Sequence, residues 1–164
     1  MNQALAERIQ RAKVLLETAR HATMATVNVD GTPHNTPFFF IHGEKLEYIY
    51  WGSHPDALHS QNIVRTGNVF IVVYDMMEKG GLYIKGTKAH KLSGSELEKA
   101  LEIHNVLRAK EGSKPIDLSY YTGDSPQRMY ATKPTNFWVN IGKKSKEGMM
   151  LQDLRVEVNL ADLI

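Results

Sequence analysis

The chain has 164 residues, a formal net charge of +2, 42% hydrophobic residues and no cysteine. This length suits one domain, and we expect residues 1–164 to form one with an N-terminal helix packed on it. The small net charge argues against a nucleic-acid partner, and the lack of cysteine excludes disulfides and thiolate metal sites. No segment resembles a signal peptide or a membrane span, so a cytoplasmic protein without a membrane partner is expected.

The first part of the chain predicts a helix followed by a meander of strands. Residues 2–20 carry apolar side chains at helical spacing, with charged residues between them, which is typical of an amphipathic helix. Alternating and aromatic segments, separated by turns such as Asp30-Gly31, then predict strands over 24–29, 36–41 and 45–51.

A helix is expected over residues 55–66. Pro55 suits a first helical turn, and Ser53 or His54 just before it can act as the cap. The spacing of the apolar residues predicts that Leu58, Ile63 and Val64 point inward.

The second part of the chain alternates apolar, β-branched segments with one long helical pattern. Strands are expected over 69–74, 82–92, 137–141 and 150–158, helices over 95–111 and around 126–131, and a loop over 112–126. The fold class that follows is mainly β with flanking helices, arranged as a β-barrel decorated by helices.

The segment 52–62 gathers polar side chains around one expected helix start. Gly52, Ser53, His54, His59 and Asn62 all lie there. A helix start offers free N–H groups and the positive end of the helix dipole, which favour an anion such as a phosphate. A capped helix with solvated polar residues is the alternative interpretation.

The residues Tyr48-Ile49-Tyr50-Trp51-Gly52-Ser53 and His59-Ser60-Gln61-Asn62-Ile63 resemble a sequence block of the pyridoxamine 5'-phosphate oxidase-like family. The resemblance implies an FMN-binding split barrel that forms a homodimer with FMN at the subunit interface. It assigns the phosphate-binding hydroxyl to Ser53 and its basic partner to His59, where many relatives have lysine. Ala57 stands where relatives often have serine.

Two further segments carry the resemblance. The strand His34-Asn35-Thr36-Pro37-Phe38-Phe39 is similar to the family's strand along the flavin edge, with His34 nearest to a phosphate-binding arginine of relatives. The segment 82–87 is similar to the family's next flavin-facing strand. Together the helix start and the resemblance predict cofactor contacts from His34, Asn35, Thr36, Pro37, Gly52, Ser53, His54, His59, Asn62, Tyr83, Lys85 and Trp138. Ordinary roles in an edge strand, a sheet surface or a packed interface are the alternatives for these side chains.

The expected function is that of an FMN-binding oxidoreductase. Hydride would pass through flavin N5 between a nicotinamide or small-molecule donor and an acceptor, and no side chain stands out as a catalytic acid or base. The alternatives are an F420-dependent reductase, a non-enzymatic flavin or haem binding or sensor protein, and a barrel that has lost its cofactor. The histidine spacing predicts no zinc site, and the C-terminal signature of true pyridoxamine-phosphate oxidases is not recognisable.

Overall fold

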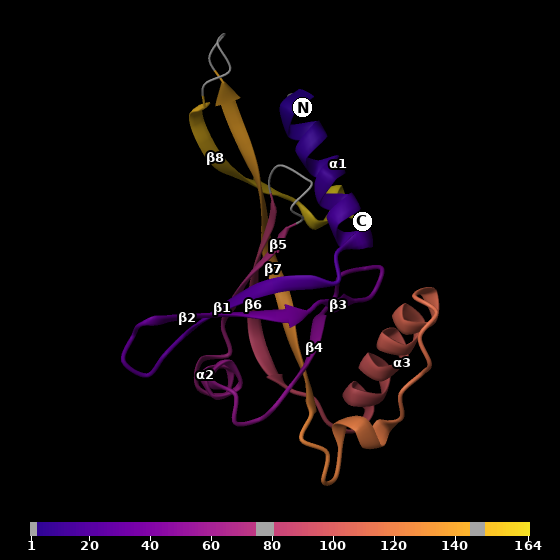
Figure 1. Cartoon of the computed structure of the whole chain (residues 1–164). Helices are drawn as coiled ribbons and strands as arrows, with labels where there is room; N and C mark the ends of the chain where they lie inside the picture. The colour runs from indigo at the N-terminus through magenta and orange to yellow at the C-terminus, as the bar shows by residue number, and fades with distance from the viewer. Residues whose placement is uncertain (1–2, 75–80, 145–149) are drawn as a thin grey trace.

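The computed structural model describes residues 3–74, 81–144 and 150–164. The elements in chain order are α1 (Gln3–Thr18), β1 (His21–Val27), β2 (Pro33–Phe39), β3 (Ile41–His42), β4 (Ile49–Ser53), α2 (Leu58–Thr66), β5 (Val69–Tyr74), β6 (Gly81–Lys91), α3 (Gly94–Lys110), the 3₁₀ turn η1 (Leu118–Tyr121), β7 (Arg128–Lys144), β8 (Met150–Val158) and the 3₁₀ turn η2 (Leu160–Asp162). Their arrangement is shown in Figure 1.

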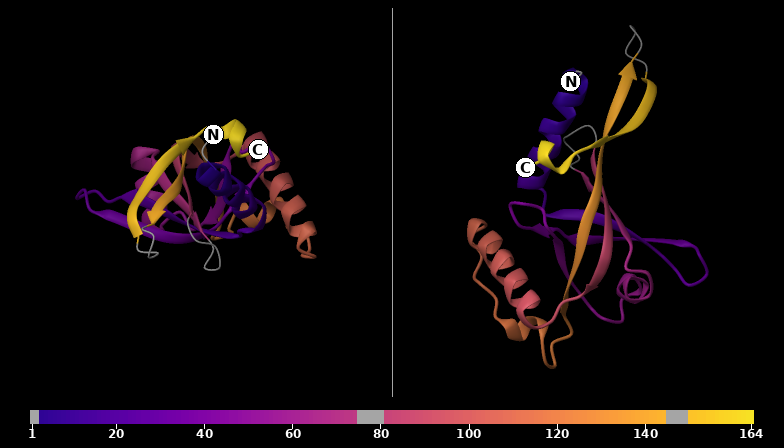
Figure 2. Two further views of the ribbon diagram at one scale, coloured as in Figure 1. Left: turned by 90° about the horizontal axis from the view of Figure 1, so that it is seen from above. Right: turned by 180° about the vertical axis from the view of Figure 1, so that it is seen from behind.

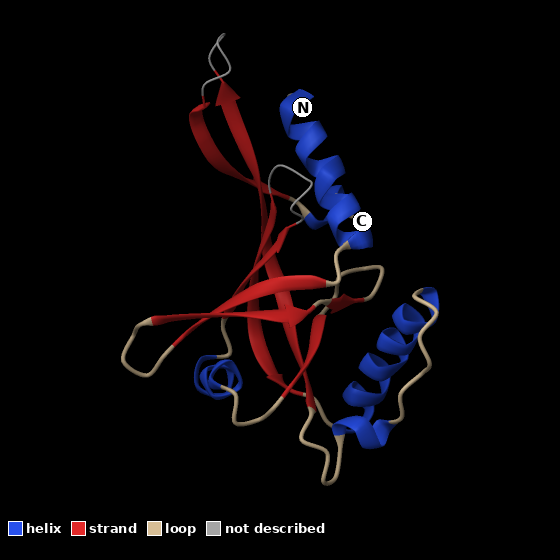
Figure 3. Ribbon diagram, in the orientation of Figure 1, coloured by secondary structure: helices blue, strands red, loops and turns tan. Residues whose placement is uncertain are grey.

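The strands form one antiparallel sheet in the order β2-β1-β5-β6-β7-β4-β3, with β8 added along β7. The long strand β7 pairs with β4 through its first residues, with β8 through its last, and with β6 along its length. Register shifts in the β6–β7 pair at Lys85/Gly86 and Thr87/His90 bend the sheet. Because of this curvature β1 and β2 cross the direction of β7 (Figure 3). The expected mainly β fold with flanking helices is confirmed.

One face of the sheet forms the core. Met24, Ile71, Ile84 and Phe137 are register partners on four adjacent strands and are all buried. The helix α1 packs against the same cluster through its buried residues, which are Ile9, Ala12, Leu15 and Leu16. The amphipathic helix expected over 2–20 is therefore confirmed in type and position.

The helix α3 covers a second, smaller core beside β3 and β4. Leu97 and Ala100 of this helix pack with Ile41, Tyr50 and Tyr121. Figure 2 shows α3 standing away from α1, on the part of the molecule opposite the β7–β8 hairpin. A side-chain ion pair between Arg20 and Glu111 joins the ends of the two helices.

Several expectations for the helices are wrong. The helix expected from Pro55 begins only at Leu58, where Ala57 is the N-cap without a side-chain hydrogen bond, and Leu58 and Val64 are exposed. The backbone N–H of Asp56 donates instead to the ring of His54, which closes a turn ahead of the helix.

The short helix expected around 126–131 is absent, because β7 begins at Arg128. Pairing with β4 and β6 holds the chain extended from this residue onward. A 3₁₀ turn lies earlier, at Leu118–Tyr121, within the expected loop.

None of the helices in the described ranges is long and apolar enough to cross a membrane.

Replacement of Gly86 by alanine is expected to destabilise the protein by about 1–3 kcal/mol, the usual cost of overpacking. A Cβ atom at Gly86 would lie 2.5 Å from Thr132 Oγ1 and 2.7 Å from Val69 Cγ2 at the bend of β6. Denaturant unfolding measures the change. Gly43→Ala is the matched control, since its nearest contact would be Ile103 Cδ1 at 3.5 Å. Equal stabilities of the two variants would contradict this account of the bend.

Candidate functional site

The end of β4 and the first turn of α2 place three polar side chains in contact. The Ser53 hydroxyl oxygen lies 2.6 Å from His59 Nε2, and the Ser60 hydroxyl donates to the Ser53 oxygen over 3.2 Å. Ser53 is 8% exposed and Ser60 is fully buried. We call Ser53, His59 and Ser60 the hydroxyl–imidazole cluster.

The start of α2 beside this cluster is open to an anion. The first-turn N–H groups of a helix have no acceptor within the helix, and Ala57 provides no side-chain oxygen to replace one. The positive end of the helix dipole lies at the same place. Backbone N–H groups, a hydroxyl and an imidazole therefore lie on the end of β4 and the first turn of α2, and donors of these kinds suit a phosphate group.

His34 adds a second imidazole to the site. Its ring, on β2, lies parallel to that of His59, with an interplanar angle of 6° and 6.4 Å between centroids. Burial first, and repulsion by His34 second, lower the pKa of His59 below its ordinary value of 6.5. His59 is therefore neutral at physiological pH while no anion is present.

Asn62 holds α2 in place on the barrel. Its buried side-chain amide donates to Thr26 Oγ1 over 3.1 Å and to Asn28 Oδ1 over 2.9 Å. These bonds join the helix to β1 and the residue after it. The structure thus gives Asn62 a supporting role behind the cluster, and a direct cofactor contact stays a prediction.

Gly52 and His54 flank Ser53 without joining the cluster. A Cβ atom at Gly52 would lie 3.1 Å from Cε1 of Tyr121, so a tyrosine ring packs closely on this position. His54 is exposed and its Nδ1 accepts the N–H of Asp56. Contacts of Gly52 and His54 with a cofactor also stay predictions.

Tyr83, Lys85 and Trp138 belong to a second group of predicted residues, on the sheet face opposite the core. Tyr83 and Trp138 are register partners there, the Arg155 guanidinium lies 4.0 Å from the Tyr83 ring centroid, and Phe70 contacts both rings. The exposed Lys85 follows two residues after Tyr83 on the same face.

Strand alternation also divides β2 between the two groups. Pairing across the sheet links Pro37, Thr23, Val72, Tyr83 and Trp138 in one row, so Pro37 and Asn35 share the face of the second group. His34 and Thr36 face the other way, with Thr26 and Met24 as register partners. Within one chain the two groups lie on opposite faces of the sheet.

Sequence reasoning missed Ser60, His104 and Tyr121. Ser60 follows His59 directly, but only the packing of α2 shows that its hydroxyl turns toward Ser53. Tyr121, beneath Gly52, hydrogen-bonds through its hydroxyl to His104 Nδ1 at 3.3 Å, and burial raises the pKa of Tyr121 to about 12. No local signal in the sequence joins these two residues to β4.

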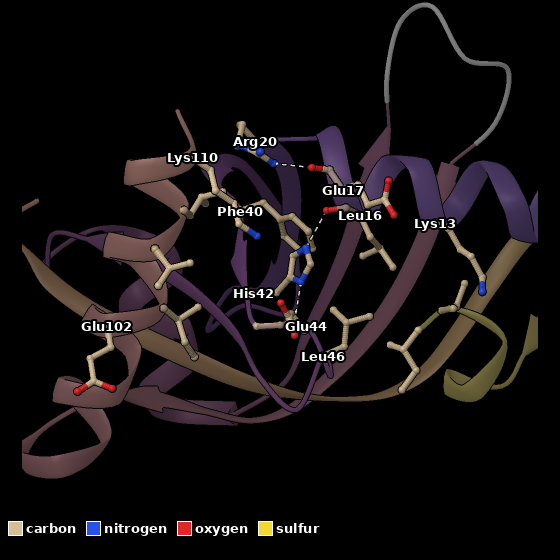
Figure 4. A pocket seen from close by; sticks show the side chains of 16 residues that line it. Lys13, Leu16, Glu17, Arg20, Phe40, His42, Glu44, Leu46, Glu102 and Lys110 are labelled. Carbon is tan, nitrogen blue, oxygen red and sulfur yellow. Dashed lines mark hydrogen bonds between the residues drawn. The ribbon is translucent and has the colours of Figure 1, made fainter. Parts of the chain in front are cut away.

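A cavity of about 860 Å³ lies elsewhere, between α1, the β3–β4 turn and α3 (Figure 4). His42 closes one side of it, with Nε2 at 2.8 Å from the Leu16 carbonyl oxygen and Nδ1 at 2.9 Å from that of Gly43. The cavity shares no residue with the hydroxyl–imidazole cluster. Its charged residues are the cations Lys13, Arg20 and Lys110 and the carboxylates Glu17, Glu44 and Glu102. Because these charges balance, they do not select an anionic ligand.

Comparison with known proteins identifies the fold. No protein-family model and no curated protein matches the sequence. Among solved structures, a Clostridium acetobutylicum protein related to general stress protein 26 of B. subtilis, of the pyridoxinephosphate oxidase family, matches with a TM-score of 0.62 and 12% identity over 93% of this chain and 96% of that one. The fold is the split barrel of the pyridoxamine 5'-phosphate oxidase-like proteins. The split barrel expected from the sequence is thus confirmed.

Other split-barrel structures are similar to the same degree. A heme binding protein from Mycobacterium smegmatis matches with a TM-score of 0.64 and 15% identity, over 96% of this chain and 59% of that one. A protein named F420 reductase matches with a TM-score of 0.55 and 19% identity, over 76% and 94% of the two chains. At these identities the likeness is one of fold.

The lowered pKa of His59 predicts a pH effect on stability. Because the unfolded chain binds a proton at His59 at a higher pH than the folded chain does, the free energy of unfolding falls as the pH drops below about 6.5. We expect His59→Gln to reduce this slope in pH-dependent unfolding experiments. His104, whose pKa is also lowered by burial, accounts for part of the pH dependence that remains in this variant. His21→Gln, at an exposed position, serves as the control, and an unchanged slope in His59→Gln would contradict the assignment.

Proposed function

We propose that the chain binds FMN non-covalently, with the 5'-phosphate at the start of α2. The observation that carries the proposal is the hydroxyl–imidazole cluster beside a helix start that has no side-chain cap. A phosphate monoester carries close to two negative charges and accepts several hydrogen bonds. The donors present fit it in kind, since a hydroxyl, an imidazole and uncapped backbone N–H groups lie on two adjoining elements.

Each residue of the site then has a defined task. Ser53 donates a hydrogen bond to the phosphate, His59 supplies charge, and the first-turn N–H groups of α2 complete the cradle. Asn62 keeps the helix on β1, so that these donors stay in register. Bound FMN would supply hydride transfer at flavin N5 between a nicotinamide or small-molecule donor and an acceptor.

We propose further that the protein works as a homodimer. Phe70, Val72, Tyr83 and Trp138 form a half-buried apolar surface on the sheet face opposite α1. Association of two chains through this face would bury the surface. The family resemblance implies FMN at the subunit interface, so in such a dimer the second group of predicted residues is expected to contact a flavin held between the two chains.

The surroundings of His42, His59 and His90 argue against these three rings as haem ligands. Haem iron needs an imidazole nitrogen that is free to bind it. Both ring nitrogens of His42 and of His90 face other acceptors, and His59 Nε2 contacts Ser53. F420, as the larger cofactor, calls for more cationic side chains than the cluster provides.

Loss of the cluster should weaken FMN binding without affecting riboflavin. Removal of two charge-assisted hydrogen bonds in Ser53→Ala/His59→Ala costs a few kcal/mol, since each contributes about 1.5–3 kcal/mol. The dissociation constant for FMN is therefore expected to rise by about a hundredfold or more. Fluorescence titration with FMN and with riboflavin measures both affinities.

The control for this experiment is Val64→Ala, an exposed position on the same helix. It should bind both ligands as the wild type does. An unchanged FMN affinity in a correctly folded double variant would remove the proposed phosphate site.

A charge placed in the apolar surface should separate the chains. Trp138→Glu is expected to give a monomer with weakened FMN binding, because the apolar ring is lost and association would have to bury a carboxylate. Light scattering after size-exclusion chromatography measures the mass. Val29→Glu, at an exposed turn position, is the control. A wild-type protein that is monomeric with FMN bound would contradict the dimer.

A further inference from the structure

The distances within the cluster indicate the direction in which the Ser53 hydroxyl points. Ser60 donates to the Ser53 oxygen, so the single hydrogen of Ser53 must go to an acceptor. His59 Nε2 lies at 2.6 Å from that oxygen, while the carbonyl oxygen of His54 lies at 3.4 Å. The short bond to the imidazole takes the hydrogen. A neutral His59 that accepts at Nε2 carries its own hydrogen on Nδ1.

In this state the site is poorly prepared for a phosphate. The Ser53 hydrogen is used internally, and the His59 imidazole carries no charge. Protonation of His59 at Nε2 reverses the short bond, because the imidazolium then donates to the Ser53 oxygen. That oxygen now accepts from both His59 and Ser60, and the hydrogen of Ser53 becomes free to turn outward.

We infer that binding of the FMN phosphate is coupled to the uptake of one proton by His59, and that this proton releases the Ser53 hydroxyl to the phosphate. The inference rests on the proposed function and adds how the site regulates its affinity. The proton comes from solvent and moves onto Nε2, and no covalent bond to the ligand forms. One proton thus provides both a positive charge and a hydrogen-bond donor.

The surroundings of His59 lower its pKa in the absence of an anion. Burial and the parallel ring of His34 lower the pKa of His59, and a dianion beside the imidazole raises that pKa again. Without a ligand the imidazole is neutral at physiological pH. The proton and the phosphate therefore bind together.

Other titratable groups lie on the elements around α2, and none of them is a cause of the shift at His59. They are His54 and Asp56 of the preceding loop, Arg65 of α2 itself, His21 of β1, Lys85, Lys88, His90 and Lys91 of β6, and Arg128, the register partner of Ser53 on β7. The Arg128 guanidinium donates to the backbone carbonyl oxygens of Gly123, Ser125 and Gln127.

Calorimetric titration with FMN in buffers of different ionisation enthalpy tests the coupling. Between about pH 7 and pH 9 the phosphate stays almost fully a dianion, since its second pKa is about 6. At pH values between the pKa of His59 in the free protein and its raised pKa in the complex, we expect uptake of up to one proton per FMN and a dissociation constant that rises with pH by up to about tenfold per pH unit. Riboflavin should bind without proton uptake.

His59→Lys is the matched variant, because lysine carries its charge throughout this range. It should bind FMN with neither proton uptake nor pH dependence. A second readout uses the protein alone: long-range ¹H–¹⁵N NMR should show a neutral His59 with its hydrogen on Nδ1. An imidazolium in the free protein at neutral pH would overturn the inference.

The outcomes separate the inference from the function on which it rests. If the wild type binds FMN with no proton uptake and with constant affinity, the coupling is wrong and the phosphate site stands. If neither the wild type nor His59→Lys binds FMN at any pH in the range, the proposed function fails and the coupling fails with it.

Discussion

The contact between the end of β4 and the first turn of α2 is the constraint on which the site depends. The strand fixes Ser53 through its pairing with Arg128 on β7, and the helix brings His59 and Ser60 to within hydrogen-bond distance. The amide of Asn62 ties the far side of the helix to β1. Two elements of the sheet therefore determine where the helix start lies, and the donors for an anion follow from that position.

The histidine at position 59 changes the character of this site. A lysine there would keep its charge at every physiological pH. The His59 imidazole is half-buried and stacks on His34, which lowers its pKa, so it is neutral at the same pH. The charge available to an anion then depends on the proton concentration. The hydroxyl pair Ser53–Ser60 matters for the same reason, since it decides which way the short bond to the imidazole points.

Much of the fold could be predicted from the sequence, because local patterns carry it. The stripe of Ile9, Ala12 and Leu16 predicts α1, and the β-branched run of β5 predicts a buried strand. The predicted start of α2 is wrong because the turn before the helix depends on a hydrogen bond from the backbone N–H of Asp56 to the ring of His54. The predicted start of β7 is wrong because β4 and β6, which are distant in the sequence, hold this segment extended.

The candidate site also combines residues that local sequence predicts with contacts that only the folded chain shows. The sequence predicts Ser53 and His59 as site residues because they lie close together in a recognisable block of sequence. The role of Ser60 depends on the rotation of α2, and the stacking of His34 on His59 joins residues far apart in the chain. Asn62 was grouped with the cofactor contacts because it is near them in sequence, and only the structure shows its bonds to Thr26 and Asn28.

The most direct test of the phosphate site is a crystal structure of the protein grown with FMN. The account predicts one phosphate group per chain, within hydrogen-bond distance of the Ser53 hydroxyl and His59 at the start of α2. A phosphate bound anywhere else, such as the cavity between α1 and α3, would contradict it.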